Sequence, residues 1–294
     1  MVRARSAALA AGLAVLATVA ACAPADEESG SSSAAPSTGG TGECTPGALP
    51  TRTEGRFTIG TDSPAYPPWF VDDDPTNGEG YESAVAYAVA EELGYARDAV
   101  DWTVVRFNTA VAPGPKEFDV DINQVSITDE RRTAVDFSSG YYDVRQAVIA
   151  LETSPIAGAT SIAELQGARL GAQVGTTSLE LLTDVIAPSQ EPSVFQSNDL
   201  AKAALANGQV DGIVVDLPTA FYITGAEVEG STVVGQFEQT ATGADVEQFG
   251  MVLDKGSPLT ACVTAAVDAL RDDGTLAELE ERWLAEAADA PVLR

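Results

Sequence analysis

The chain has 294 residues, of which 45% are hydrophobic and 20% are charged, a composition typical of one or two domains with a packed core. It carries 44 acidic and 16 basic residues and no histidine, for a formal net charge of −28 at pH 7. Such a surface repels nucleic acid and anionic lipid head groups, so we expect no nucleic-acid partner and attribute the charge to solubility or salt adaptation. Without histidine the chain lacks the usual proton shuttle and the commonest metal ligand, which disfavours serine hydrolases and zinc enzymes. We therefore expect no metal site and no cofactor.

The N-terminus has the layout of a secretory signal peptide. Two arginines precede an apolar run, 7–19, which is too short for a comfortable membrane span. The run ends in VAAC at Cys22, which resembles a lipobox, the site where bacterial lipoproteins are acylated and cleaved; the alternative is a plain signal peptide with an incidental cysteine. We predict a signal peptide over 1–21 and lipidation of Cys22, which would hold the protein at the outer face of the cell membrane. Residues 22–54 then form the lipid anchor and a tether, flexible because it is rich in Ser, Gly, Ala and Pro.

Two cysteines, Cys44 and Cys262, remain after Cys22 is assigned to the lipid. Disulfides persist in exported proteins, so we predict a bond between these two residues. The alternative is two unrelated free thiols.

Strands and helices alternate along the folded region. In its first half, apolar alternation and flanking turn residues predict strands at 56–62, 100–107, 118–127 and 146–151, and helices at 82–93 and from Thr128. An aromatic loop at 66–70 contains two prolines, which fix φ and prevent a helix there. In the second half we predict strands at 168–174, 210–215 and 248–253, and helices at 161–165, 179–185, 200–207, 258–271 and 275–286. This alternation indicates an α/β architecture with mostly parallel sheets.

Six sequence motifs in order along 55–286 identify a family resemblance. They are Gly60-Thr-Asp62 with Tyr66-Pro-Pro-Trp69; Gly80-Tyr81 with Glu91-Glu-Leu-Gly94; Ser126-Ile-Thr-Asp-Glu-Arg131 with Asp136-Phe-Ser138 and Tyr141-Tyr142; Leu165-Gln-Gly167 with Gly175-Thr-Thr177; Asn207-Gly-Gln-Val-Asp-Gly212 with Val215-Asp216; and Asp273-Gly-Thr-Leu276 with Trp283. Together they resemble the bacterial extracellular solute-binding proteins of family 3, the amino-acid receptors of ABC importers.

The resemblance implies a type II periplasmic-binding-protein-like fold with two α/β lobes joined by two crossover strands. Lobe 1 would comprise about 55–150 plus 243–294, and lobe 2 about 151–242. A ligand would bind in the cleft between the lobes and be buried by closure. The implied function is that of a monomeric substrate-binding lipoprotein, attached to the membrane by its lipid only, that passes an amino acid or similar solute to ABC permease subunits.

The motifs also imply which residues bind the ligand. Arg131 stands at the position of the family's carboxylate-binding arginine, and a guanidinium can hold a carboxylate through two hydrogen bonds; the alternative is a surface arginine. Thr177 lies at a predicted helix N-terminus, which suits an anion, but it could be an ordinary N-cap. Ser126 matches a position that contacts the ligand's backbone groups. Gln124 and Asn123 are polar residues just upstream, and we expect them to line the cleft, with Gln124 among the ligand-binding residues.

Acidic and aromatic residues complete the predicted site. Asp216 follows a buried run and would bind the ligand's ammonium group, with a turn or cap role as the alternative, and Asp62 would form a second anionic wall. Tyr66 and Trp69 could stack on the ligand, or Trp69 could pack in the core. Tyr66 follows Asp62 by four residues, one more than in many family members, so its role could differ.

Two other functions stay open. Some relatives of this fold dehydrate prephenate-like acids, and here the acid would be Asp62, Asp216 or Glu180, although nothing in the sequence sets two carboxylates in opposed roles. A ligand-sensing module is the second alternative. We favour the receptor, with no enzymatic activity and no catalytic residues, because a lipid anchor suits it best.

Overall fold

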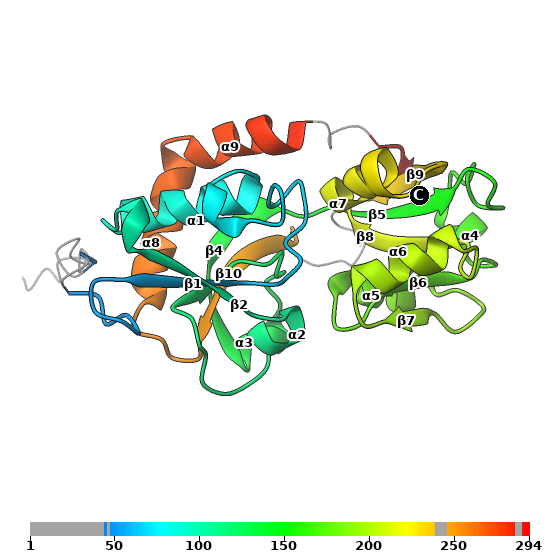
Figure 1. Ribbon diagram of the computed structural model, residues 1–294. Helices are drawn as coiled ribbons and strands as arrows, with labels where there is room; N and C mark the ends of the chain where they lie inside the picture. Colours follow the sequence, from blue (N-terminus) through cyan, green and yellow to red (C-terminus); the bar gives the residue numbers. More distant parts are fainter. Residues whose placement is uncertain (1–43, 46–47, 239–245, 286–289) are drawn as a thin grey trace, which may run out of the picture. The chain divides into compact units, whose positions relative to one another are not determined.

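The computed structural model describes residues 44–45, 48–238, 246–285 and 290–294. The predicted signal peptide, the lipidation site Cys22 and the tether up to residue 43 lie outside the described residues. The described chain forms two mixed β-sheets, each with helices on both faces (Figure 1). We call each sheet with its helices a lobe.

The first lobe is built on a five-stranded sheet. Its order is β2 (Val100–Val104), β1 (Phe57–Thr61), β3 (Val120–Asp121), β10 (Gln248–Asp254) and β4 (Val135–Asp143). One face packs against α1 (Tyr81–Glu92), α8 (Thr260–Asp272) and α9 (Thr275–Leu284). Val85, Val89, Val263 and Val267 at this interface are 0% exposed, and burying each is worth roughly 1.5–3 kcal/mol. The other face carries α2 (Phe107–Ala110) and α3 (Asp129–Arg132).

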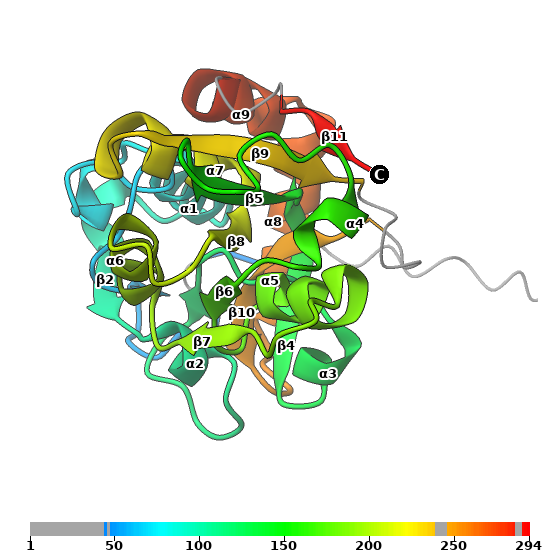
Figure 2. The same ribbon diagram turned by 90° about the vertical axis from the view of Figure 1, so that its right-hand side faces the viewer.

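The second lobe is built on a six-stranded sheet. Its order is β11 (Val292–Leu293), β9 (Ser231–Phe237), β5 (Gln146–Leu151), β8 (Gly212–Asp216), β6 (Leu170–Gln173) and β7 (Ser193–Phe195). Figure 2 shows α6 (Asn198–Ala206) on one side of this sheet and α4 (Ile162–Leu165) and α5 (Thr177–Leu181) on the other. The π-helix η3 (Leu182–Ile186) continues α5, while α7 (Leu217–Tyr222) and the π-helix η4 (Ile223–Glu227) pack on the side of α6. The short helices η1 (Pro75–Asn77) and η2 (Arg97–Ala99) flank α1.

The chain passes between the sheets at two strand connections, which the family resemblance predicted. The first is the two-residue link between β4, which ends at Asp143, and β5, which begins at Gln146. The second joins β9 to β10. Because β5 pairs with β8 and β9, it belongs to the second lobe, so the expected boundary after residue 150 is too late. The end of the chain also differs from the expected lobe 1, since β11 pairs with β9.

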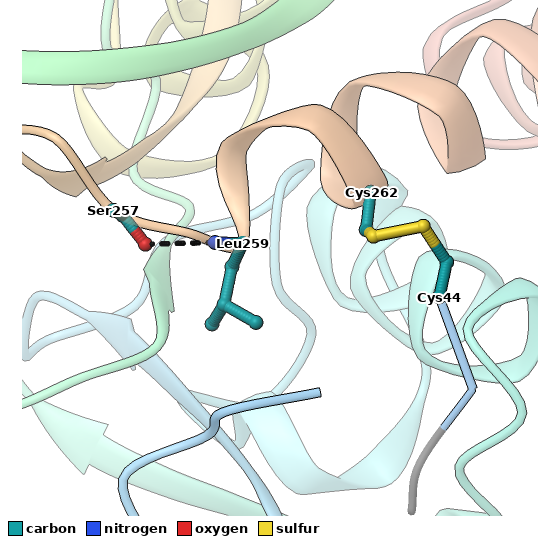
Figure 3. The surroundings of a disulfide bond; sticks show 4 residues. All are labelled: Cys44, Ser257, Leu259 and Cys262. Carbon is teal, nitrogen blue, oxygen red and sulfur yellow. Dashed lines mark hydrogen bonds between the residues drawn. A yellow bond between two sulfur atoms is a disulfide. The ribbon is translucent and has the colours of Figure 1, made fainter. Parts of the chain in front are cut away.

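A disulfide bond joins Cys44 to Cys262 on α8, as predicted, with 5.4 Å between the Cα atoms (Figure 3). It connects the first described residues to a helix of the first lobe, 218 positions away in sequence. At the start of α8, the Ser257 hydroxyl accepts a hydrogen bond of 3.2 Å from the Leu259 amide. The start of the folded region is thus covalently fixed to the core of the first lobe.

Two structural expectations need correction. Residues 118–127 are almost all buried, and only Val120–Asp121 forms a strand, because the chain turns at Gln124 with φ +48°. The sheets are mixed rather than mostly parallel. Their antiparallel pairs all involve β5 and β10, the strands that follow the two connections between the lobes.

Candidate functional site

A cavity of about 480 Å³ lies between the two lobes. Its volume is within the roughly 300–1,000 Å³ typical of small-molecule sites. The first lobe contributes the end of β1, the loop that follows it, and residues near α2, β3 and α3; the second lobe contributes the loops after β6, β7 and β8. The lining includes Thr61, Asp62, Tyr66, Arg106, Phe107, Asn123, Gln124, Ser126, Arg131, Gln173, Thr177, Gln196, Asp199 and Asp216. Seven of the eight predicted ligand-binding residues, all except Trp69, therefore line one cavity.

Arg131 lies between the two lobes at this cavity. Thr128 caps the short helix α3 by accepting a hydrogen bond of 3.2 Å from the Arg131 amide, which fixes where the side chain starts. The guanidinium donates to the Ser126 carbonyl at 2.6 Å and, across the cleft, to the Gly175 carbonyl at 2.9 Å. Burial lowers the pKa of Arg131 below its ordinary value, but an arginine stays charged in proteins. The guanidinium is thus a fixed positive charge on the cavity wall.

Thr177 is not the N-cap of α5, which was one of its two possible roles. That role belongs to Thr176, whose hydroxyl accepts from the Leu179 amide at 3.2 Å. The Thr177 hydroxyl instead lies 3.3 Å from the Ser126 hydroxyl of the first lobe and 3.4 Å from Nε2 of Gln146. Thr177 therefore presents its side chain to the cavity, where the two lobes meet.

Two carboxylates face Arg131 across this group of hydroxyls. Asp216, at the end of β8, accepts a hydrogen bond of 2.8 Å from Nε2 of Gln146. Glu247, which precedes β10, accepts from the Ser126 hydroxyl at 2.6 Å and from the same Gln146 nitrogen at 3.4 Å. Burial and the nearby charge of Glu247 raise the pKa of Asp216 to about 8. The two carboxyl groups outnumber the one guanidinium, so this part of the cavity suits a cationic group of a ligand.

Sequence reasoning did not predict Glu247 or Gln146. Both flank the connections between the lobes: Gln146 begins β5 just after the first connection, and Glu247 comes just before β10 at the end of the second. Polar residues at the starts of these strands were the available signal. No sequence spacing brings Glu247 near Ser126, because they are 121 positions apart and meet only when β10 returns to the first sheet.

Asp62 and Tyr66 line the cavity, and both also hold local structure. The Asp62 carboxylate accepts from the Phe107 amide at 3.1 Å, which ties the end of β1 to the start of α2. The Tyr66 hydroxyl donates to Asp199 on α6, so it links the lobes at the cavity. Nζ of Lys202 lies 4.5 Å from the centre of the Tyr66 ring. Burial and the Asp199 carboxylate raise the pKa of Tyr66.

Trp69 does not line the cavity, so its predicted stacking on the ligand is corrected. The side chain is 1% exposed and makes edge contacts with Tyr81, Tyr142 and Phe249 in the first-lobe core. Its indole nitrogen donates to the Thr219 hydroxyl of the second lobe at 2.9 Å. Trp69 is therefore a packing residue that also joins the lobes.

The described part of the chain contains no cluster of three or more His, Cys, Asp or Glu residues placed to hold a metal ion. Nor does any helix in that part have the length and apolar character needed to span a membrane.

Comparison with known proteins points to one family. The model of the bacterial extracellular solute-binding proteins, family 3, matches residues 57–286. The L-cystine-binding protein TcyJ of Escherichia coli (strain K12) is 28% identical over 238 residues, which cover 78% of this chain and 82% of the relative. The structure of an ancestral arginine-binding protein bound to glutamine has a TM-score of 0.63 and 26% identity, covering 79% of this chain and 98% of that one. An ancestral amino-acid-binding protein, a precursor of cyclohexadienyl dehydratase, has a TM-score of 0.61 and 27% identity, covering 78% of this chain and 94% of that one.

Proposed function

This chain belongs to the bacterial extracellular solute-binding proteins of family 3, and we propose that it captures an amino acid outside the cell for an ABC importer. We further propose that it is anchored through lipid on Cys22 and acts as a monomer that delivers its ligand to permease subunits. The names of its relatives support an amino-acid ligand, since they include an L-cystine-binding protein and an ancestral protein bound to glutamine.

The placement of the Arg131 guanidinium near the carboxyl groups of Asp216 and Glu247 is the observation that carries this proposal. A free amino acid has a carboxylate and an ammonium group about two bonds apart. Arg131 would hold the carboxylate, with the Thr177 hydroxyl as a further donor. Asp216 would accept hydrogen bonds from the ammonium group, and Glu247, just behind Ser126, would stabilise its charge. Gln124, Tyr66 and Asp62 would then surround the ligand side chain.

A thermal-shift screen of the mature protein tests this proposal. The panel contains L-arginine, L-glutamine, L-cystine and L-histidine, with glycine betaine and prephenate as comparisons. A ligand at a hundredfold its Kd adds about 2.7 kcal/mol of stability, which gives a clear rise in Tm. We expect a rise with at least one amino acid. A response to prephenate or betaine alone would contradict the proposed zwitterion site.

A dehydratase-like enzyme is the second candidate, because one observation favours it. With its pKa raised to about 8, Asp216 is protonated at neutral pH, which is the form that a general acid requires. Asp62 also lines the cavity, whereas Glu180 does not. Incubation with prephenate or arogenate, with product detection by absorbance, distinguishes the candidates; turnover that Asp216→Asn abolishes would establish the enzyme.

Localisation and signalling require separate experiments. If Cys22 carries lipid, Cys22→Ala should release the protein from the membrane fraction into the medium. If the protein serves an importer, deletion of its gene should abolish uptake of the amino acid found in the screen. Intact uptake after deletion would favour a ligand-sensing module.

A further inference from the structure

Glu82 is a buried carboxylate that lies outside the cavity. It stands in the first turn of α1 and is 0% exposed. Its two oxygens accept three hydrogen bonds, from the Gln124 amide at 2.7 Å, from the Gln124 side chain, and from the Tyr141 hydroxyl. Removing a carboxylate from water costs several kcal/mol unless such donors compensate it, so its place in the core requires a reason.

The partner of Glu82 has an unusual backbone. Gln124 has φ +48°, in the left-handed region, which costs a residue with a Cβ atom roughly 1–2 kcal/mol. The backbone amide and the side-chain amide of Gln124 both donate to Glu82 at this turn. Glu82 therefore stabilises a conformation that the residue alone would not favour.

The strained turn leads directly into the site. Two residues after Gln124, the Ser126 carbonyl accepts from the Arg131 guanidinium, and the Ser126 hydroxyl donates to Glu247. After Gln124 the chain is fixed by β10, since the Gly250 amide donates to the Val125 carbonyl at 3.0 Å. At Gln124 itself the chain is fixed by Glu82. The direction of the Ser126 groups depends on both attachments.

We infer that Glu82 is a positioning residue for the ligand site, an inference that rests on the proposed function. Its carboxylate holds Gln124 in the left-handed conformation, and this sets the Ser126 carbonyl and hydroxyl that orient Arg131 and Glu247. Without Glu82, Gln124 relaxes toward ordinary φ values, the Ser126 groups rotate, and the guanidinium loses the carbonyl that aims it at the cavity.

The alternative is that Glu82 only stabilises the packing of α1, and two variants of its neighbours distinguish the roles. Ser83→Ala is a matched control, because Ser83 is equally buried on the same helix turn but donates to the Pro75 carbonyl, away from the site. Tyr141→Phe removes one donor to Glu82 and leaves both bonds to Gln124. A positioning role requires Glu82→Ala to affect the site much more than either variant does.

The test combines amide hydrogen exchange at Gln124 in the ligand-free protein with calorimetric titration of L-arginine, L-glutamine, L-cystine and L-histidine. For Glu82→Ala we expect at least about tenfold faster exchange. We also expect about tenfold weaker binding of the amino acid that the wild type binds, equivalent to about 1.4 kcal/mol. Ser83→Ala and Tyr141→Phe should change both readouts by less than about twofold. Should Glu82→Ala not fold, Glu82→Gln replaces it. Its amide cannot accept from both groups of Gln124 as the carboxylate does, so an effect of at least about threefold is expected.

Introducing Glu82→Ala into a Gln124→Gly variant as well as into the wild type makes the test specific. Glycine adopts a left-handed φ without cost, so in Gln124→Gly the loss of affinity on Glu82→Ala should shrink to less than about threefold. Unchanged exchange at Gln124, or equal losses in both backgrounds, overturns the positioning role. If Arg131→Ala binds as the wild type does, or if the wild type binds none of the four amino acids, the proposed function fails. The exchange measurement would then still show whether Glu82 holds the turn at Gln124.

Discussion

The charge state of Glu82 gives a prediction about stability that can be worked out from the structure. Burial raises the pKa of Glu82 from its ordinary 4.5 to about 7, even though three donors favour the carboxylate. The folded state then binds this proton more tightly than the unfolded state does. The stabilisation from the proton is fully present below pH 4.5 and is lost as the pH rises through about 7. At about 1.36 kcal/mol per pH unit, the loss is roughly 3 kcal/mol.

Glu82→Gln removes this proton linkage because the amide does not titrate. Relative to the wild type, the free energy of unfolding of the variant should rise by roughly 3 kcal/mol between pH 4 and pH 8. Urea unfolding at five or six pH values, with the disulfide intact, measures the difference. Ser83→Ala is again the control, and its difference from the wild type should not vary with pH. A flat difference for Glu82→Gln, or one that falls as the pH rises, would refute this reasoning.

Three further predictions follow from the disulfide and the cavity. Replacing Cys44 and Cys262 by serine should lower the unfolding free energy by about 5 kcal/mol, because the disulfide closes a loop of 218 residues and so restricts the unfolded chain. Ligand affinity should not change. Chemical unfolding measures the first effect, and calorimetry measures the second. Tyr66→Phe removes the hydrogen bond to Asp199 between the lobes, which is worth about 1 kcal/mol. Ligand dissociation, measured by stopped-flow fluorescence, should therefore become several-fold faster. An unchanged dissociation rate would exclude a role for Tyr66 in holding the lobes closed. The pKa of Asp216 is raised to about 8, and a bound ammonium group favours its carboxylate form, so binding should release a proton. Ligand affinity should therefore rise as the pH approaches 8, by up to about tenfold per pH unit, and Asp216→Asn should abolish this dependence. Titrations in buffers of different ionisation enthalpy detect the released proton.

Much of the fold could be predicted because local signals agree with the tertiary structure. The strands β1, β5 and β8 lie where the apolar runs placed them, and the two C-terminal helices separate at Gly274, which has φ +90°. Strand β4 was not predicted, since its aromatic and polar residues show no clear alternation. The assignment of β5 to the wrong lobe has a similar cause: a buried strand has the same pattern whichever sheet it joins.

The site could be predicted only as far as its motif positions. Residues such as Arg131 and Asp216 follow recognisable patterns, and the structure brings both to the cavity. Trp69 could not be assigned from sequence, because an indole in a Pro-rich loop can face a ligand or a core. Glu82 and Glu247 could not be predicted because their importance comes from partners distant in sequence, 42 positions away for Gln124 and 121 for Ser126.

The most direct test of the central claim is calorimetric titration of the wild type, Arg131→Ala and Arg132→Ala with L-arginine, L-glutamine, L-cystine and L-histidine. Arg132 is adjacent in sequence but does not line the cavity, which makes it the matched control. The account predicts that one of these amino acids binds the wild type and Arg132→Ala alike. Its affinity should fall by roughly a hundredfold or more in Arg131→Ala, because a charge-assisted contact to the carboxylate is lost. Equal binding to Arg131→Ala and the wild type would contradict the claim that this guanidinium holds the ligand.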